Sequence, residues 1–156
     1  LCNAGVSAID VGGLGGTTWA GVEVYRARQQ SDTMSEELGN RFWDWGIPTA
    51  ISVIESNISV PIIATGGIRT GVDMAKSLTI GASVCAAALP LVVPALHGAE
   101  DVKARLSVFL EELKTAMFLT GSTTIGELMQ SRVVITGKTN EYLNERWIDT
   151  ARFARR

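Results

Sequence analysis

The sequence lacks several features that would mark a secreted, membrane-spanning or nucleic-acid-binding protein. Its only cysteines, Cys2 and Cys85, form neither a C-x-x-C pair nor a disulfide framework, which favours a reducing compartment and a cytoplasmic location. The longest uncharged stretch, residues 77–99, is broken by Gly81 and two prolines, so no membrane-spanning segment is predicted. Fourteen Lys and Arg residues against sixteen Asp and Glu leave a net charge of −2 without a basic block. Nucleic-acid binding is therefore not predicted either.

The composition is that of one folded domain. Apolar residues make up 46% of the chain and charged residues 19%, which supplies a core and argues against intrinsic disorder. The length of 156 residues corresponds to a single domain, residues 1–156. Residues 1–5 resemble the end of a helix stopped by Gly5, and such an end normally follows earlier structure. We therefore expect the N-terminal part of a larger protein to be missing from this chain.

Short apolar runs alternate with helical patterns. Residues 7–11, 60–64 and 82–88 are typical of buried parallel strands. Helices are predicted over residues 47–55, 89–97 and 100–119, and between a capping box at Thr70–Asp73 and Gly81. The remaining expectations are a helix or ordered loop at 19–28, an exposed polar segment at 29–37, a helix at 36–45, a short helix from Thr124, a strand at 132–136, a helix at 140–146 and a solvated tail at 152–156.

This alternation of strands and helices predicts an α/β fold with a parallel sheet. A doubly wound sheet and a (β/α)8 TIM barrel both fit the pattern. A complete barrel needs about 250 residues, so this chain would hold only its last three or so strand–helix units.

Two segments at the predicted carboxyl ends of strands are suited to binding a phosphate group. These are Thr65-Gly66-Gly67-Ile68-Arg69 and Ala87-Ala88-Leu89-Pro90, each followed by a predicted helix. Glycine lets an anion approach the backbone N–H groups, and a helix N-terminus adds a partial positive charge. The alternative is that Gly66 and Gly67 only form a tight turn.

A third segment, residues 12–19, contains four glycines followed by Thr17, Thr18 and Trp19. Such a loop can lie flat against a planar ligand and offer hydroxyl groups to it. The segment is neither G-x-G-x-x-G nor a P-loop, so it does not favour a Rossmann domain or a nucleotide-triphosphate site.

Together these segments resemble the type 2 isopentenyl-diphosphate isomerases, in the same order and spacing over nearly all of the chain. The matching segments are residues 10–19, 64–71, Asp73-x-Ala75-Lys76, Gly81-Ala82, Ala88-Leu89-Pro90 and 117–121. The resemblance implies an FMN-dependent TIM barrel that interconverts isopentenyl and dimethylallyl diphosphate. It also implies a need for Mg²⁺, NADPH as the usual flavin reductant, and a homo-oligomer. The chain would be the C-terminal part of such a barrel.

The resemblance assigns roles to individual residues. Thr17 would touch the flavin, and Trp19 and Glu23 would lie on the substrate side of it as catalytic residues. The FMN phosphate would be held by Gly66, Gly67, Ile68, Arg69, Ala88 and Leu89. The residues that this family uses for Mg²⁺ and for the substrate diphosphate belong to the N-terminal half, so no metal ligand is expected in this chain. Trp147 stands where the family usually has glycine. Because glycine commonly ends a helix, the substitution makes a helix end at this position less expected.

Isomerisation of an allylic double bond needs a proton added at one carbon and removed at another, and a reduced flavin can serve as that acid–base group. Two alternatives remain at the level of sequence: another FMN barrel, similar to the glutamate-forming synthase domain, and a non-catalytic, phosphate-binding partial barrel. Glu23 fits an ordinary surface charge as well as a catalytic role. His97 and Cys85 are expected to be structural.

Overall fold

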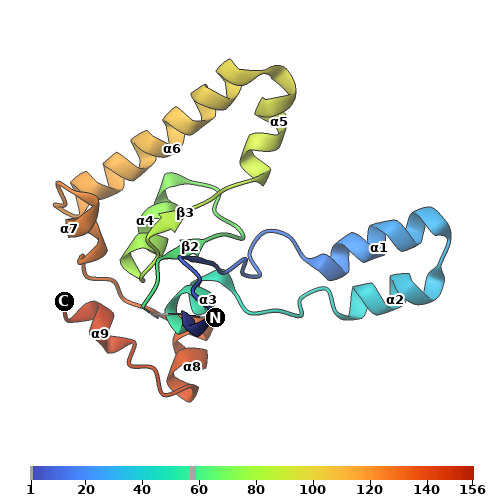
Figure 1. Cartoon of the computed structure of the whole chain (residues 1–156), viewed down its shortest axis with the longest axis horizontal. Coiled ribbons are helices and arrows are strands. Elements are labelled where there is room, and N and C mark those ends of the chain that lie inside the picture. The colour runs from blue at the N-terminus through green and yellow to red at the C-terminus, as the bar shows by residue number, and fades with distance from the viewer. Residues whose placement is uncertain (1, 57–58) are drawn as a thin grey trace.

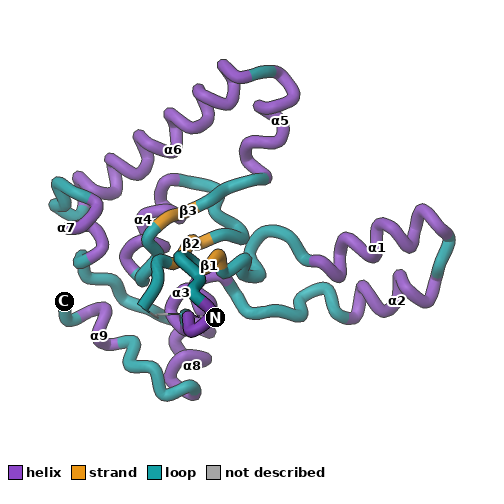
Figure 2. Tube along the Cα trace, in the orientation of Figure 1, coloured by secondary structure: helices purple, strands orange, loops and turns teal. Residues whose placement is uncertain are grey.

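A three-stranded parallel sheet forms the centre of the molecule. The computed structural model describes residues 2–56 and 59–156. Strands β1 (Ile9–Asp10), β2 (Ile62–Ala64) and β3 (Val84–Cys85) lie side by side in that order (Figures 1 and 2). Ile9 pairs with Ile62, and Ile63 pairs with Val84. The expected α/β architecture with parallel strands is confirmed, and the strands are shorter than expected.

The helices lie before, between and after these strands. A 3₁₀ turn at Cys2–Ala4 precedes β1; the sequence expected a helix end here, and Leu1 lies outside the described residues. The helices are α1 (Trp19–Gln30), α2 (Thr33–Arg41), α3 (Thr49–Glu55), α4 (Gly71–Thr79), α5 (Leu89–His97), α6 (Ala99–Leu119), α7 (Ile125–Met129), α8 (Gly137–Glu145) and α9 (Ala151–Ala154). None of the helices within the described ranges is both long and apolar enough to cross a membrane.

Apolar residues bury the central strand of the sheet, β2. Val53 of α3 packs with Ile62, Ala64 and Ala82, all of them nearly inaccessible to solvent. A second cluster joins α3 to the C-terminal helices through Ile54, Leu143 and Phe153. The remaining cluster joins α4, α6 and α7 around Ala75, Leu78, Leu113 and Leu128. Burial of these side chains is the main term that stabilises the sheet.

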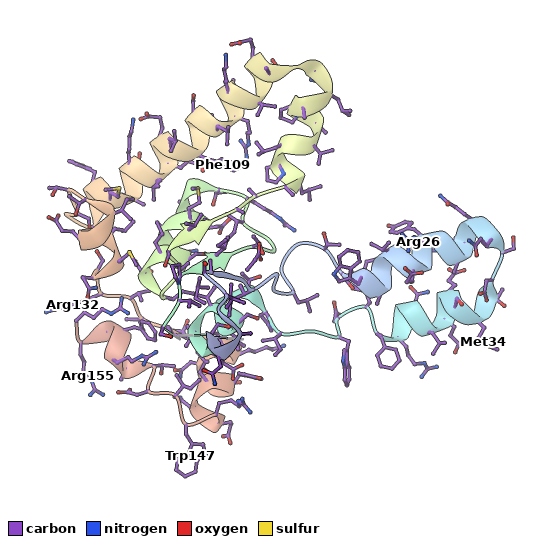
Figure 3. All side chains as sticks on the ribbon, viewed as in Figure 1. Arg26, Met34, Phe109, Arg132, Trp147 and Arg155 are labelled. Atoms are coloured by element: carbon purple, nitrogen blue, oxygen red, sulfur yellow. The ribbon has the colours of Figure 1, made fainter. Side chains whose placement is uncertain are left out.

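The helix α4 begins where the sequence predicts. The Thr70 hydroxyl accepts a hydrogen bond from the Asp73 N–H at 3.1 Å, and the Asp73 carboxylate accepts one from the Thr70 N–H, which completes the capping box. A Cβ at Gly71 would collide with the backbone of α6 at Phe109, so glycine allows the two helices to pack closely. Figure 3 labels Phe109 on α6.

Two helical pairs extend from the sheet. The pair α1 and α2 projects away from it, whereas α5 leads away from β3 and α6 returns to pack against α4 (Figure 1). The α1–α2 pair is tied at its base, where the Thr18 hydroxyl donates to the Trp43 carbonyl at 2.6 Å and also accepts from the Gly21 N–H at 3.4 Å.

The structure corrects three expectations. The helix expected at 36–45 is α2, which runs from Thr33 to Arg41 because the Asp32 carboxylate caps its start. The segment 29–37 is mainly exposed, as expected, although it is largely helical. Residues 132–136 form no strand; the Val133 N–H donates to the Phe153 carbonyl. The tail 152–156 is not simply solvated, since Phe153 is buried.

Arg156 ties that tail to two helix ends. Its guanidinium donates to the carbonyls of Thr79 and Met129 at 2.6 and 2.7 Å, and these residues end α4 and α7. The guanidinium also stacks on the Phe153 ring, 4.7 Å from its centroid. Cations are favourable at helix C-termini, so this contact holds α9 in place.

Trp147 ends α8 in a strained conformation. Its φ is +62°, and its side chain is 96% exposed and points away from the molecule (Figure 3). The helix stop is therefore present although the residue is not glycine. The left-handed conformation costs a residue with a Cβ roughly 1–2 kcal/mol, whereas glycine loses about 0.5–1 kcal/mol more in chain entropy.

We therefore predict that Trp147→Gly raises the free energy of unfolding by about 0.5–1 kcal/mol, measured by denaturant unfolding of the full-length protein. Gln130→Gly is the matched control, because Gln130 is an exposed helix-ending residue with a φ of −95°. This control should destabilise the protein. A destabilising Trp147→Gly would mean that the ring makes contacts which outweigh the strain.

Cys85 is the last residue of β3, and its side chain contacts α4. Its thiol is half-buried and lies 3.7 Å from the Met74 carbonyl. Burial raises the pKa of the Cys85 thiol to about 11, and a hydrogen bond with Ser77 opposes this rise only in part. The neutral thiol therefore persists at physiological pH, which fits a structural role.

From this pKa, we predict that at pH 8 Cys85 reacts with iodoacetamide about 100-fold more slowly than a free thiol, because only the thiolate reacts. The rate should rise about tenfold per pH unit up to about pH 10. Peptide-level mass spectrometry measures it, with urea-unfolded protein as the control. Rapid labelling of the folded protein at pH 7 would contradict the buried, neutral thiol.

Candidate functional site

A cavity of about 360 Å³ lies at the carboxyl ends of β2 and β3. Its walls come from three loops that are distant in sequence: Gly16 and Thr17 after β1, the segment after β2, and the segment that leads from β3 into α5. The lining residues are Gly16, Thr17, Thr65, Gly66, Gly67, Ile68, Arg69, Ala86, Ala87, Ala88, Leu89 and Pro90. The structure therefore brings together all seven residues that the sequence analysis assigned to cofactor binding.

Two glycine segments form one side of this cavity by packing backbone against backbone. Gly66 and Gly67 have φ values of +91° and +89°, a region that favours glycine. A Cβ on Gly66 would collide with the carbonyl oxygen of Gly13, and one on Gly67 with that of Gly15. A Cβ on Gly16 would lie 2.8 Å from the Gly67 nitrogen. Glycine is thus required here by the contact between the loops as well as by the backbone conformation.

Four backbone donors in the segments that line the cavity have no hydrogen-bond partner among the described residues. Among the hydrogen bonds of residues 2–56 and 59–156, none uses the N–H of Gly67, Ile68, Ala88 or Leu89 as its donor. The first pair lies in the loop after β2, and the second pair begins α5, which has no side-chain cap. Backbone N–H groups arranged in this way form a binding site for an anion.

The other nearby helix N-terminus is closed. The Asp73 carboxylate accepts from the N–H groups of Arg69 and Thr70, both at 3.1 Å, and the Glu112 carboxylate accepts from the Gly71 N–H at 2.6 Å. The positive end of α4 is therefore taken by the protein's own carboxylates. An anion in the cavity would instead benefit from the N-terminus of α5.

Arg69 is the one charged residue among those that line this cavity in the described chain. Its guanidinium makes only a long contact, 3.4 Å, to the Gly15 carbonyl. It can therefore turn toward an anion at little cost, and it supplies the positive charge that the backbone donors lack.

A second cavity of about 350 Å³ lies beside the first and shares Thr17 with it. It is formed by the glycine loop after β1 and by residues that close the α1–α2 pair, and it is lined by Val11, Gly12, Gly13, Leu14, Thr17, Thr18, Trp19, Ala20, Trp45, Gly46, Ile47 and Ser52. Thr17 thus stands between an anion site and a more open surface suited to a flat group.

The two residues expected to act in catalysis are placed differently. Trp19 lines the second cavity and is 79% exposed. Glu23 lies one turn further along α1, on the exposed side, and forms an ion pair of 2.7 Å with Arg26. Glu23 lines neither cavity as the described residues form them. The structure thus brings Trp19 to the rim of the site but not Glu23.

Three polar residues that the sequence analysis did not single out hold the loops in place. The Asp10 carboxylate, at the end of β1, accepts from the Gly12 N–H at 3.0 Å and from the Thr65 hydroxyl. The Thr49 hydroxyl donates to the Gly66 carbonyl at 2.5 Å. An acidic residue two positions before a glycine loop is a signal that could have identified Asp10. Thr49 is 17 residues from its partner and gives no local signal.

Other groups with possible chemistry lie elsewhere. His97 contacts Asp101 at 3.3 Å on exposed helices, in keeping with a structural role. Within the described ranges, no group of three or more His, Cys, Asp or Glu side chains is placed to hold a metal ion. The arrangement as a whole can bind a phosphate-bearing ligand and leave a flat part of it beside Thr17 and Trp19.

Comparison with known proteins agrees with this geometry. Relatives described as isopentenyl-diphosphate delta-isomerase include those of Methanosarcina barkeri, 59% identical over 99% of this chain, and Methanosarcina mazei, 62% identical over 92%. That of Methanothermobacter thermautotrophicus is 49% identical over the whole chain. The resemblance inferred from the sequence is thereby confirmed.

The chain spans about two fifths of these relatives, namely 42%, 39% and 44% of their lengths. Within that span, residues 3–135 match the profile of a family described as FMN-dependent dehydrogenase. This match includes both glycine segments and the start of α5, so the loops that build the cavity fall within it. By this match, the chain belongs to the FMN-dependent dehydrogenase family.

Proposed function

We propose that the full-length protein that carries this chain is an FMN-dependent isomerase that interconverts isopentenyl diphosphate and dimethylallyl diphosphate. The observation that carries the proposal is the cavity lined by Gly67, Ile68, Ala88 and Leu89, whose N–H groups have no partner among the described residues, together with Arg69. This donor set fits a phosphate monoester such as that of FMN. The names of the relatives supply the substrate.

In this proposal, the chain's own residues bind and orient the cofactor. The FMN phosphate is held by the backbone donors at the start of α5 and in the loop after β2, with Arg69 as the counter-charge. Thr17 lines both cavities and Trp19 lines the second, so these two residues would contact the flavin ring. When bound in its reduced form, FMN supplies the acid–base group for adding and removing the allylic proton.

We also propose that residues 1–156 are the C-terminal part of a (β/α)8 barrel. Three features support this: parallel strands in sequence order, the site at their carboxyl ends, and the length of the relatives. The Mg²⁺ site and the groups that bind the substrate diphosphate would then lie outside this chain. NADPH as flavin reductant, a homo-oligomeric state and a cytoplasmic location complete the proposal, and they rest on the resemblance and composition.

The proposal is tested with the purified full-length protein, assayed for bound flavin and for turnover of isopentenyl diphosphate with NADPH and Mg²⁺. We predict bound FMN and turnover.

Gly67→Ala should lower FMN affinity at least tenfold, because its Cβ would push the two glycine loops apart. Gly126→Ala, in the open helix α7, is the matched control and should leave FMN affinity unchanged.

The other outcomes separate the alternatives. Bound flavin without turnover of isopentenyl diphosphate would favour another FMN enzyme, similar to the glutamate-forming synthase domain. Absence of flavin would favour a non-catalytic phosphate-binding protein. An unchanged FMN affinity in Gly67→Ala would reject the phosphate site.

For the residues near the flavin, we predict that Glu23→Gln and Trp19→Ala each lower turnover at least tenfold while FMN remains bound. A catalytic role for Glu23 requires its ion pair with Arg26 to open when substrate binds. Glu37→Gln is the matched control, since Glu37 is in a similar exposed pair with Arg41 on α2. A Glu23→Gln variant with normal turnover would show that Glu23 is an ordinary surface charge.

A further inference from the structure

The peptide bond between Gly66 and Gly67 has one of its two polar groups fixed from outside the cavity. The Gly66 carbonyl accepts the hydroxyl hydrogen of Thr49 at 2.5 Å. Thr49 is half-buried and is the first residue of α3, the helix that packs against β2. It does not line the cavity.

This hydrogen bond determines which way the other polar group points. No cis peptide bond occurs in the described residues, and in a trans peptide the C=O and N–H groups point in opposite directions. The Gly67 N–H therefore points away from Thr49. The Gly67 nitrogen lies beside Gly16, a residue that lines the cavity, because a Cβ on Gly16 would be 2.8 Å from that nitrogen.

The orientation needs an external restraint because glycine does not supply one. Gly66 and Gly67 both have positive φ values, and residues without a Cβ readily take up other backbone conformations as well. Rotation of this peptide by half a turn would present the Gly66 carbonyl oxygen to the cavity in place of the Gly67 N–H. A carbonyl oxygen would repel a phosphate at the place where an amide attracts it.

Thr49 is itself held firmly. A Cβ on Gly13 would collide with the backbone of Thr49, so the glycine loop after β1 packs directly on the start of α3. The hydroxyl thus comes from a fixed point in the fold. The restraint on Gly66 does not depend on a flexible side chain.

We infer that Thr49 is a positioning residue for the phosphate group of the flavin: its hydroxyl holds the Gly66–Gly67 peptide with the N–H directed at the phosphate. The inference deepens the proposed function and rests on it. It concerns the phosphate alone, so riboflavin, which lacks that group, separates this role from a general one.

The test compares Thr49→Val with Thr49→Ser in the full-length protein. Flavin fluorescence titration measures the dissociation constants of FMN and riboflavin for each apoprotein. We predict that Thr49→Val weakens FMN binding about tenfold, the value of one lost hydrogen bond, with riboflavin binding unchanged. Thr49→Ser keeps the hydroxyl and should bind FMN as the unsubstituted protein does. Thr115→Val is the matched control, because the Thr115 hydroxyl bonds to Glu111 on exposed α6.

Each other result overturns the inference. Equal losses of FMN and riboflavin affinity in Thr49→Val would show a general structural role. Unchanged FMN affinity in that variant, or a loss in Thr49→Ser as large as in Thr49→Val, would show that the hydroxyl does not orient the peptide. If the unsubstituted protein binds riboflavin and FMN equally or binds neither, the proposed phosphate site itself is rejected.

Discussion

Backbone packs directly against backbone where the glycine loop after β1 meets the glycine pair after β2, and the cavity depends on this contact. Side chains at these positions would separate the loops, since Gly13, Gly15 and Gly67 approach neighbouring backbone atoms more closely than a Cβ allows. The same contact places Thr17 beside the segment after β2 and sets the path of the chain into α1. The polar bonds of Asp10 and Thr49 stabilise loops whose separation the glycines have already fixed.

The two helices that begin near the cavity differ in how their N-termini are satisfied. The start of α4 is capped by the carboxylates of Asp73 and Glu112, one from the helix itself and one from α6. The start of α5 has no such cap. Because a protein carboxylate and a ligand phosphate would compete for the same N–H groups, this difference directs an anion to α5. A local capping signal therefore predicts where a helix begins. It also indicates that a ligand anion does not bind at that helix N-terminus.

Much of this organisation could be predicted from the sequence because it depends on local signals. The capping box at Thr70, the glycines at strand ends and the apolar strands are each contained within a few residues. The start of α2 was also a local signal, the cap at Asp32, but the wrong expectations at residues 132–136 and 152–156 depended on distant contacts. The segment at residue 132 looks like a strand, but it pairs with the tail through Val133 and Phe153. The hydrogen bond from Thr49 to Gly66 likewise joins elements whose proximity only the folded sheet creates.

The hydrogen bond at the base of the α1–α2 pair separates this pair from the sheet, so the sequences of the two parts can change independently. The chain leaves the sheet after Thr18 and returns at Trp43. The hydrogen bond between these two residues joins the two ends of the segment that contains α1 and α2. Residues beyond this bond form a module that packs mainly on itself and projects from the sheet (Figure 1). Insertions or deletions within it leave the strand register unchanged. Natural selection can therefore remodel the rim beside Trp19 without disturbing the glycine contact on which the cavity depends.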